Sequence, residues 1–114
     1  MLIGEYTHTL DDKKRLAVPA KFRKQLGKVV VLTRGLDRCL SLYPLETWKT
    51  LSQKLGALPM GTAGSRSFTR FIFAGAVESE VDSLGRILVP DFLKEFAELK
   101  TKVIVTGLQD HAEL

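Results

Sequence analysis

The stretch LDDKKRLAVP (residues 10–19) occurs twice in this chain, because residues 81–90 read VDSLGRILVP. Each copy contains an apolar residue, Asp, three turn residues, Arg, an apolar residue and, two positions later, Val-Pro. The offset of 71 residues is constant, as Asp11 and Asp82 or Arg15 and Arg86 show. Repetition at a fixed offset is the signature of a duplicated supersecondary unit.

The repetition extends beyond the motif on both sides. Upstream, Gly4 matches Gly75, and downstream, after a one-residue slip, Val31-Leu32 matches Val103-Ile104. The chain therefore divides into a first unit (4–42), a helical connector (43–74) and a second unit (75–114), each unit of about 40 residues. The second unit stops where the first continues toward Trp48, so we expect a C-terminal strand end and helix to be trimmed from this chain.

Hydrophobic periodicity predicts the elements of each unit. Gly4 to Leu10 alternates as a half-buried strand, and the Val-rich run at 28–32 is typical of a strand buried on both faces. Pro19, Pro44 and Pro90 suit the first turns of helices, and Gly27 suits a helix end. The remaining expected strands are 15–18, 39–43 with Cys39 in the core, 76–81, 86–89, 102–106 and a last strand starting at His111.

The connector is expected to contain two helices around a linker at 56–64. The first has Leu45, Trp48, Leu51 and Leu55 on one face, and Ser65 is the expected N-cap of the second. Phe68, Phe71 and Ile72 form the apolar face of that second helix. We expect this face to be core, and the alternatives are a ligand groove or, because Phe73 is also apolar, a subunit interface.

Composition limits the possible classes of protein. The 114 residues suit one domain, and 45% hydrophobic with 26% charged residues is ordinary for a globular chain. A net charge of +4 suits a polyanionic partner, although a solvated basic surface explains it equally well. A single cysteine excludes an internal disulfide. The chain has no apolar run of about 20 residues and no signal-like start, so we expect a cytoplasmic protein without membrane contact.

The repeated motif supports both a structural and a functional interpretation. Asp11 can bind the N–H groups of its turn and pair with Arg15 across a hairpin. The same turn would place a basic cluster at the tip of a two-stranded ribbon, which fits a DNA major groove, where Arg recognises guanine. Lys13, Lys14 and Lys24 could hold phosphates. The second copy has Leu84 and Gly85 in place of two lysines, so phosphate contact there should be weaker.

The doubled Asp-x-x-x-Arg motif, followed by Leu-Ala-Val-Pro and by Ile-Leu-Val-Pro, closely resembles the MraZ family of the AbrB-like (SpoVT-AbrB) swapped-hairpin superfamily. Gly4-Glu5-Tyr6, Leu42-Tyr43-Pro44 with Trp48, and the stretch from Gly107-Leu108 to Glu113-Leu114 extend the resemblance over essentially the whole chain. It implies an α+β fold in which two AbrB-like β-hairpin/short-helix repeats form a small barrel-like core with two connecting helices.

The resemblance also implies a function. MraZ proteins are nucleoid-associated transcription regulators that assemble into rings. They bind short direct repeats in double-stranded DNA upstream of their own operon, the division and cell-wall gene cluster. The family's DNA-contacting arginine corresponds to Arg15 and Arg86, and its signature aspartate to Asp11 and Asp82. Gly85, Pro19 and Pro90 complete the motif as structural positions.

Three other classes of protein fit the sequence less well. An enzyme is disfavoured because the only histidines, His8 and His111, have no recognisable nucleophile or metal-ligand spacing, so we expect no catalytic residue, cofactor, metal or small-molecule substrate. An RNA-binding or ribosome-associated module would explain the charge, but the basic stretch offers only Phe22 for base stacking. A non-catalytic assembly protein would not explain two basic turns.

Overall fold

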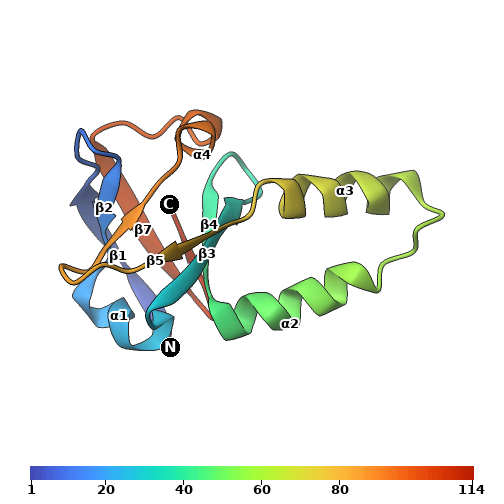
Figure 1. The fold of residues 1–114 in the computed structure, drawn as a ribbon, viewed down its shortest axis with the longest axis horizontal. Coiled ribbons are helices and arrows are strands. Elements are labelled where there is room, and N and C mark those ends of the chain that lie inside the picture. The colour runs from blue at the N-terminus through green and yellow to red at the C-terminus, as the bar shows by residue number, and fades with distance from the viewer.

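The computed structural model describes residues 1–114 and has an α+β fold, as expected (Figure 1). Six strands form an open antiparallel sheet in the order β1-β7-β8-β4-β3-β5, and β2 pairs with β6 in a separate ribbon. The sheet does not close, so the barrel-like core is not confirmed. The elements are β1 (Leu2–Thr9), β2 (Arg15–Ala17), α1 (Ala20–Leu26), β3 (Val29–Arg34), β4 (Leu40–Pro44), α2 (Leu45–Gly56), α3 (Ala63–Ala74), β5 (Val77–Glu80), β6 (Arg86–Leu88), α4 (Asp91–Phe96), β7 (Lys102–Gln109) and β8 (Ala112–Glu113).

The two halves of the chain exchange strands. β1 pairs with β7, β3 with β5 and β2 with β6, so strands before the connector pair with strands after it. The expected hairpin inside each unit is therefore wrong: the two sides of the first turn are linked only at its base, by the Leu10–Leu16 bridge and by the bond from the Asp11 N–H to the Arg15 carbonyl at 3.0 Å. The exchange places Leu16 opposite Ile87, and both side chains are 1% exposed. Burial of these two side chains favours pairing between the units, because an isolated two-stranded hairpin has no further surface that could bury them.

The strand register corrects the alignment of the two units. His8 lies opposite Val103, and Ser79, which matches His8 at the offset of 71, lies opposite Val30. Val30 is therefore the counterpart of Val103, and the expected match of Val31 to Val103 is wrong by one residue. A one-residue shift in a strand reverses which side chains face the core.

Helix boundaries follow the prolines closely. Pro19, Pro44 and Pro90 each stand immediately before a helix, with ψ values of 132°, 147° and 152°, one residue earlier than a first helical position. α1 ends at Gly27, whose φ of 78° favours glycine. The predicted cap at Ser65 is wrong, since α3 already begins at Ala63 after Thr62.

The buried core lies between the main sheet, the β2–β6 ribbon and the two short helices. Both halves contribute to it, with Leu16 and Phe22 from the first and Ile87 and Leu93 from the second. The expected burial of β3 on both faces is confirmed by Val30, Val31, Leu32 and Thr33. Cys39 is not strand core as expected, because it lies before β4 and is only half-buried.

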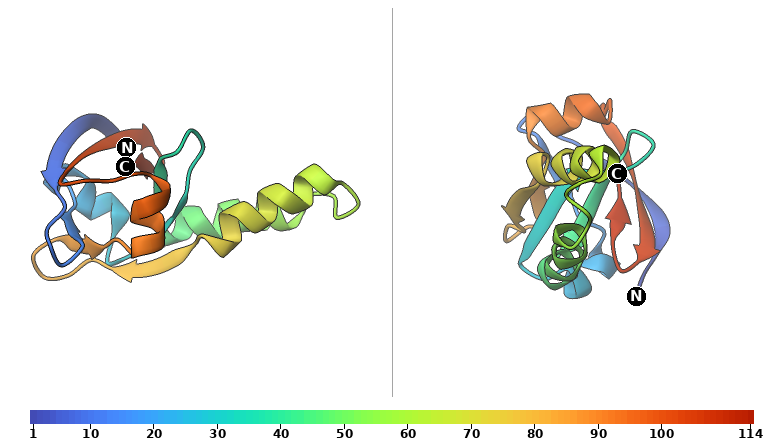
Figure 2. Two further views of the ribbon diagram at one scale, coloured as in Figure 1. Left: turned by 90° about the horizontal axis from the view of Figure 1, so that it is seen from above. Right: turned by 90° about the vertical axis from the view of Figure 1, so that its right-hand side faces the viewer.

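Helices α2 and α3 form an arm that projects from this body (Figures 1 and 2), and the molecule measures 44 × 27 × 22 Å. The hydroxyl of Thr33 donates to the Ile72 carbonyl at 2.6 Å and fixes the base of the arm to β3. The expected core face of α3 is only partly correct: Ile72 is buried and Phe71 half-buried, but Phe68, further along the arm, is 38% exposed. No helix of the structure is both long and apolar enough to span a membrane.

Candidate nucleic-acid interface

The two motif turns have the same backbone arrangement, and an aspartate holds each one. Asp11 Oδ1 accepts the N–H groups of Lys13 and Arg15, both at 2.9 Å. In the second turn, Asp82 Oδ1 accepts those of Leu84 at 2.9 Å and Arg86 at 2.8 Å. These bonds, first among them the one from the arginine N–H, lower the pKa of each aspartate below its usual range. Each aspartate therefore stabilises its turn most strongly when its carboxyl group is ionised.

Each turn is also bonded to the other copy of the motif. Lys14 and Gly85 occupy the left-handed region, with φ of 64° and 75°. This conformation aims their carbonyls outward: the Lys14 carbonyl accepts the N–H of Val89, and the Gly85 carbonyl accepts that of Val18, both at 2.8 Å. The two motifs thereby form one reciprocal structure.

The ribbon places both motif arginines on one face. Arg15 lies opposite Leu88, and Arg86 lies opposite Ala17. Side chains alternate along strands, so Leu16 and Ile87 point into the core while both arginines point outward. From strand spacing and rise, their Cα atoms are about 8 Å apart. The turns themselves lie at opposite ends of the ribbon, since its strands are antiparallel and each begins directly after its turn (Figure 1).

The two arginines differ in what holds them. Arg86 Nε donates to Asp82 Oδ2 at 3.0 Å, and its Nη1 lies 3.9 Å from Asp11 Oδ2. Arg15 forms no ion pair and donates no side-chain hydrogen bond, so the expected pairing of its guanidinium with Asp11 is not made. Arg86 is therefore pre-oriented between two carboxylates, whereas the half-buried Arg15 side chain has no such partner.

The three lysines named from the sequence are separated in the structure. Lys13 is exposed at the tip of the first turn. Lys14 Nζ instead pairs with Asp91 Oδ2 at 2.6 Å, at the start of α4. Lys24 is exposed on α1, the helix that lies beside the second turn. Of these three lysines, only Lys13 offers an unpaired charge beside the first turn.

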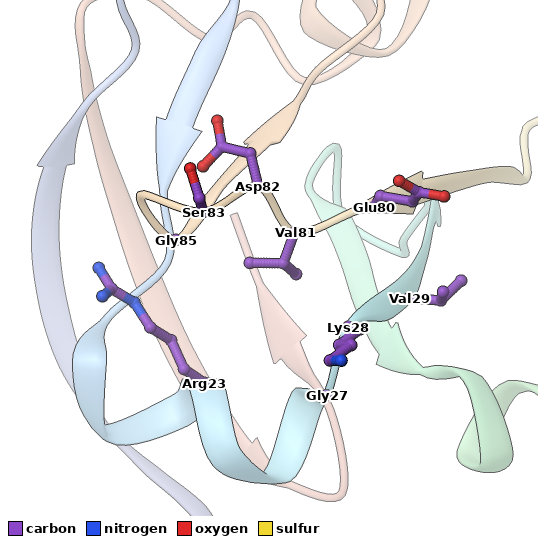
Figure 3. A pocket seen from close by; sticks show the side chains of 9 residues that line it. All are labelled: Arg23, Gly27, Lys28, Val29, Glu80, Val81, Asp82, Ser83 and Gly85. Carbon is purple, nitrogen blue, oxygen red and sulfur yellow. The ribbon is translucent and has the colours of Figure 1, made fainter.

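Sequence reasoning missed a basic side chain at the second turn. Arg23 of α1 extends toward Gly85, as Figure 3 shows, and its Nε donates to the Val18 carbonyl at 3.1 Å. It borders a hollow of about 610 Å³ whose other lining residues include Lys28 and Asp82. The available signal was Gly85 itself, because a glycine where the first copy has Lys14 indicates a close neighbour.

Comparisons with known proteins agree on one family. The family model described as "MraZ protein, putative antitoxin-like" matches residues 1–71 and 72–114. Curated relatives named "Transcriptional regulator MraZ" include those of Caldanaerobacter subterraneus subsp. tengcongensis (50% identical), Moorella thermoacetica (49%) and Halothermothrix orenii (48%). Each alignment covers 100% of this chain and 80% of the relative.

Proposed function

The chain belongs to the MraZ family, and from this membership we propose that it is a transcriptional regulator that binds double-stranded DNA sequence-specifically. One observation supports this proposal above the others: Arg15 and Arg86 share the exposed face of the β2–β6 ribbon. A two-stranded ribbon fits the major groove, and an arginine can donate two hydrogen bonds to guanine there.

In the proposed complex, the ribbon enters the major groove with its arginine face toward the bases. The arginine Cα atoms, about 8 Å apart, span roughly two base-pair steps of about 3.4 Å each. Arg86 meets its base already oriented by Asp82 and Asp11, while Arg15 becomes ordered on binding. Phosphates are contacted by Lys13 and, with weaker attraction, by Lys14 and Lys24. These contacts set the orientation of the protein on the DNA.

We propose further that the target is a set of short direct repeats upstream of the chain's own operon, the division and cell-wall cluster, and that the protein acts at the nucleoid. Several copies in a ring would engage several repeats, which raises the effective affinity without new contacts. The units 4–42 and 75–114, joined by the connector 43–74, would then be the two DNA-facing halves of each copy.

A surface outside the ribbon supports assembly into such a ring. β1 is an edge strand of the main sheet, and an unpaired edge is a ready site for association. On the outer side of β1 and β7, Ile3 lies opposite Leu108, with exposures of 62% and 41%, and Ile104 is 53% exposed. An apolar group on an exposed sheet face is typical of a protein contact.

Footprinting tests the proposed target. The DNA is a fragment from upstream of the chain's own gene, compared with a fragment in which only the short repeats are scrambled. We expect regularly spaced protection on the first fragment and none on the second. Protection that is absent, or identical on both fragments, would contradict sequence-specific binding.

A further inference from the structure

We propose that each motif turn binds DNA phosphate with the help of a basic side chain from the opposite unit: Arg23 serves the second turn and Lys94 the first. The inference rests on the proposed function and adds phosphate contacts to it. It also changes the sequence-based expectation that the second turn, without its lysines, holds the backbone weakly.

The first observation is the position of Arg23 against Gly85. The Nη2 atom of Arg23 would lie 2.7 Å from a Cβ added at Gly85, so the guanidinium occupies the space that any larger residue would need. Its Nε is bound to the Val18 carbonyl, but it forms no ion pair and the residue is exposed. Its remaining N–H groups are therefore available to an anion beside the second turn.

The second observation is that a matching hollow lies beside the first turn. A hollow of about 690 Å³ there is lined by the turn residues Asp11 and Asp12 of one unit and by Lys94 and Lys100 of the other. Lys94 is the counterpart of Arg23 at the offset of 71, and the hollow beside the second turn is likewise lined by residues of both units. The two turns of the repeat thus each lie beside a hollow lined by residues of both units.

The exchanged strands explain why the helper residue comes from the other unit. The bond from the Val89 N–H to the Lys14 carbonyl draws the start of α4 onto the first turn, and the reciprocal bond at Gly85 draws α1 onto the second. Each short helix therefore lies beside the turn that its own unit does not contain.

Charge accounting favours an anion at both places. At the first turn Asp91 pairs with Lys14 and Asp11 is bound to turn N–H groups, so the remaining charges that line the hollow are the cations Lys94 and Lys100 and the carboxylate of Asp12. At the second turn the carboxylate of Asp82 is bound to Arg86 and to turn N–H groups, so the remaining charges that line the hollow are the cations Arg23 and Lys28 and the carboxylate of Glu80. Each hollow therefore has one more cation than free carboxylates. Phosphate groups beside a ribbon in the major groove match this placement.

The test measures the salt dependence of DNA binding by the full chain, using fluorescence anisotropy between about 50 and 200 mM salt. The variants are Arg23→Gln and Lys94→Gln, with Arg70→Gln and Lys54→Gln on the exposed arm as matched charge controls. Each is measured on a repeat-containing and a scrambled duplex. Losing one phosphate contact should weaken binding equally on both duplexes and reduce the slope of log affinity against log salt by about one.

Arg23→Lys keeps the charge and should keep the salt slope, and thermal melting shows whether each variant is folded. The inference is overturned if folded Arg23→Gln and Lys94→Gln retain the wild-type slope, or if their loss is confined to the repeat duplex. The proposed function fails separately if the wild-type protein does not prefer the repeat duplex to the scrambled one. The salt slope can still be measured in that case, because phosphate contacts on the scrambled duplex do not depend on sequence preference. Absence of binding to both duplexes would overturn both.

Discussion

At the residue scale, the motif aspartates act mainly on their own backbone. Asp11 and Asp82 each accept two turn N–H groups, and only Asp82 also binds its arginine side chain directly. The spacing of Asp and Arg in the sequence predicted that each aspartate holds its turn and pairs with its arginine, but not that the two turns differ. The exchange of strands also brings Asp11 within 3.9 Å of Arg86, a contact between the two motifs that local spacing does not predict.

The lowered aspartate pKa values predict an acid-sensitive fold. Because the folded pKa lies below the unfolded one, the unfolded chain binds more protons at low pH. The stabilisation is complete above the ordinary aspartate pKa of about 3.9 and is lost as pH falls through the lowered values. Urea titrations of wild type and the double variant Asp11→Asn, Asp82→Asn should differ at pH 7 and converge at low pH. A constant difference at all pH values would contradict this role.

Gly85 should not tolerate a side chain. Its φ of 75° strains any L-residue, and an added Cβ meets the guanidinium of Arg23. Gly85→Ala should therefore lower the free energy of unfolding by about 1 kcal/mol or more. Gly64→Ala is the control, because this exposed helix position has open space and should gain about 0.5–1 kcal/mol. Chemical denaturation measures both, and equal effects of one sign would exclude the proposed contact.

At the scale of elements, the base of α3 depends on β3. The Thr33 hydroxyl and the Arg34 guanidinium satisfy the carbonyls of Ile72 and Phe71 in the last turn of α3, at 2.6 and 3.2 Å. The last carbonyls of a helix have no partner within the helix itself. The two strand residues therefore decide how firmly the arm is attached to the body.

Thr33→Val tests this attachment. Valine has the same shape but cannot donate, so a buried carbonyl loses its partner and the free energy of unfolding should fall by about 1–3 kcal/mol. Thr50→Val, which removes an exposed hydroxyl bonded to the Glu46 carbonyl on α2, should change it by less than about 0.5 kcal/mol. If both variants melt at the wild-type temperature, the bond from Thr33 does not hold the arm.

The sequence predicted the existence of the elements better than their partners. Proline positions located α1, α2 and α4, and the Val29–Leu32 run identified a strand buried on both faces. Local patterns could not distinguish a hairpin from an exchanged pair, because the same turn and the same alternation serve both. The counterpart of Val103 was misplaced by one residue for a related reason, since only the pairing partner fixes register.

At the scale of the whole molecule, the motif arginines could be found from the repeat, but Arg23 and Lys94 could not be identified, because Gly85 indicates a close neighbour without showing which residue it is. Their placement depends on long-range bonds between the two units, which no local pattern reveals. Likewise the exposed Ile3 and Leu108 become neighbours only through the pairing of β1 with β7. The duplicated chain thus builds its charged and its apolar surfaces from both halves together.

Assembly through the apolar face of β1 and β7 predicts a concentration-dependent oligomer. Sedimentation velocity of wild type should give a mass that is a multiple of the 12.7 kDa chain. Ile3→Glu should shift it toward one chain, because a charge buried without a partner is costly, whereas Lys49→Glu on the arm should not. Wild type that stays at 12.7 kDa across the concentration series would contradict ring assembly.

The most direct test of the central claim, that the β2–β6 ribbon recognises bases, is the affinity of Arg15→Ala for a repeat-containing and a scrambled duplex, measured by anisotropy at fixed salt. Loss of a base-contacting arginine should cost about 1–3 kcal/mol on the repeat duplex and reduce its advantage over the scrambled one. Lys54→Ala, an exposed arm lysine, is the control and should leave that advantage intact. If Arg15→Ala binds both duplexes as wild type does, the motif only stabilises its turns and the ribbon does not recognise DNA.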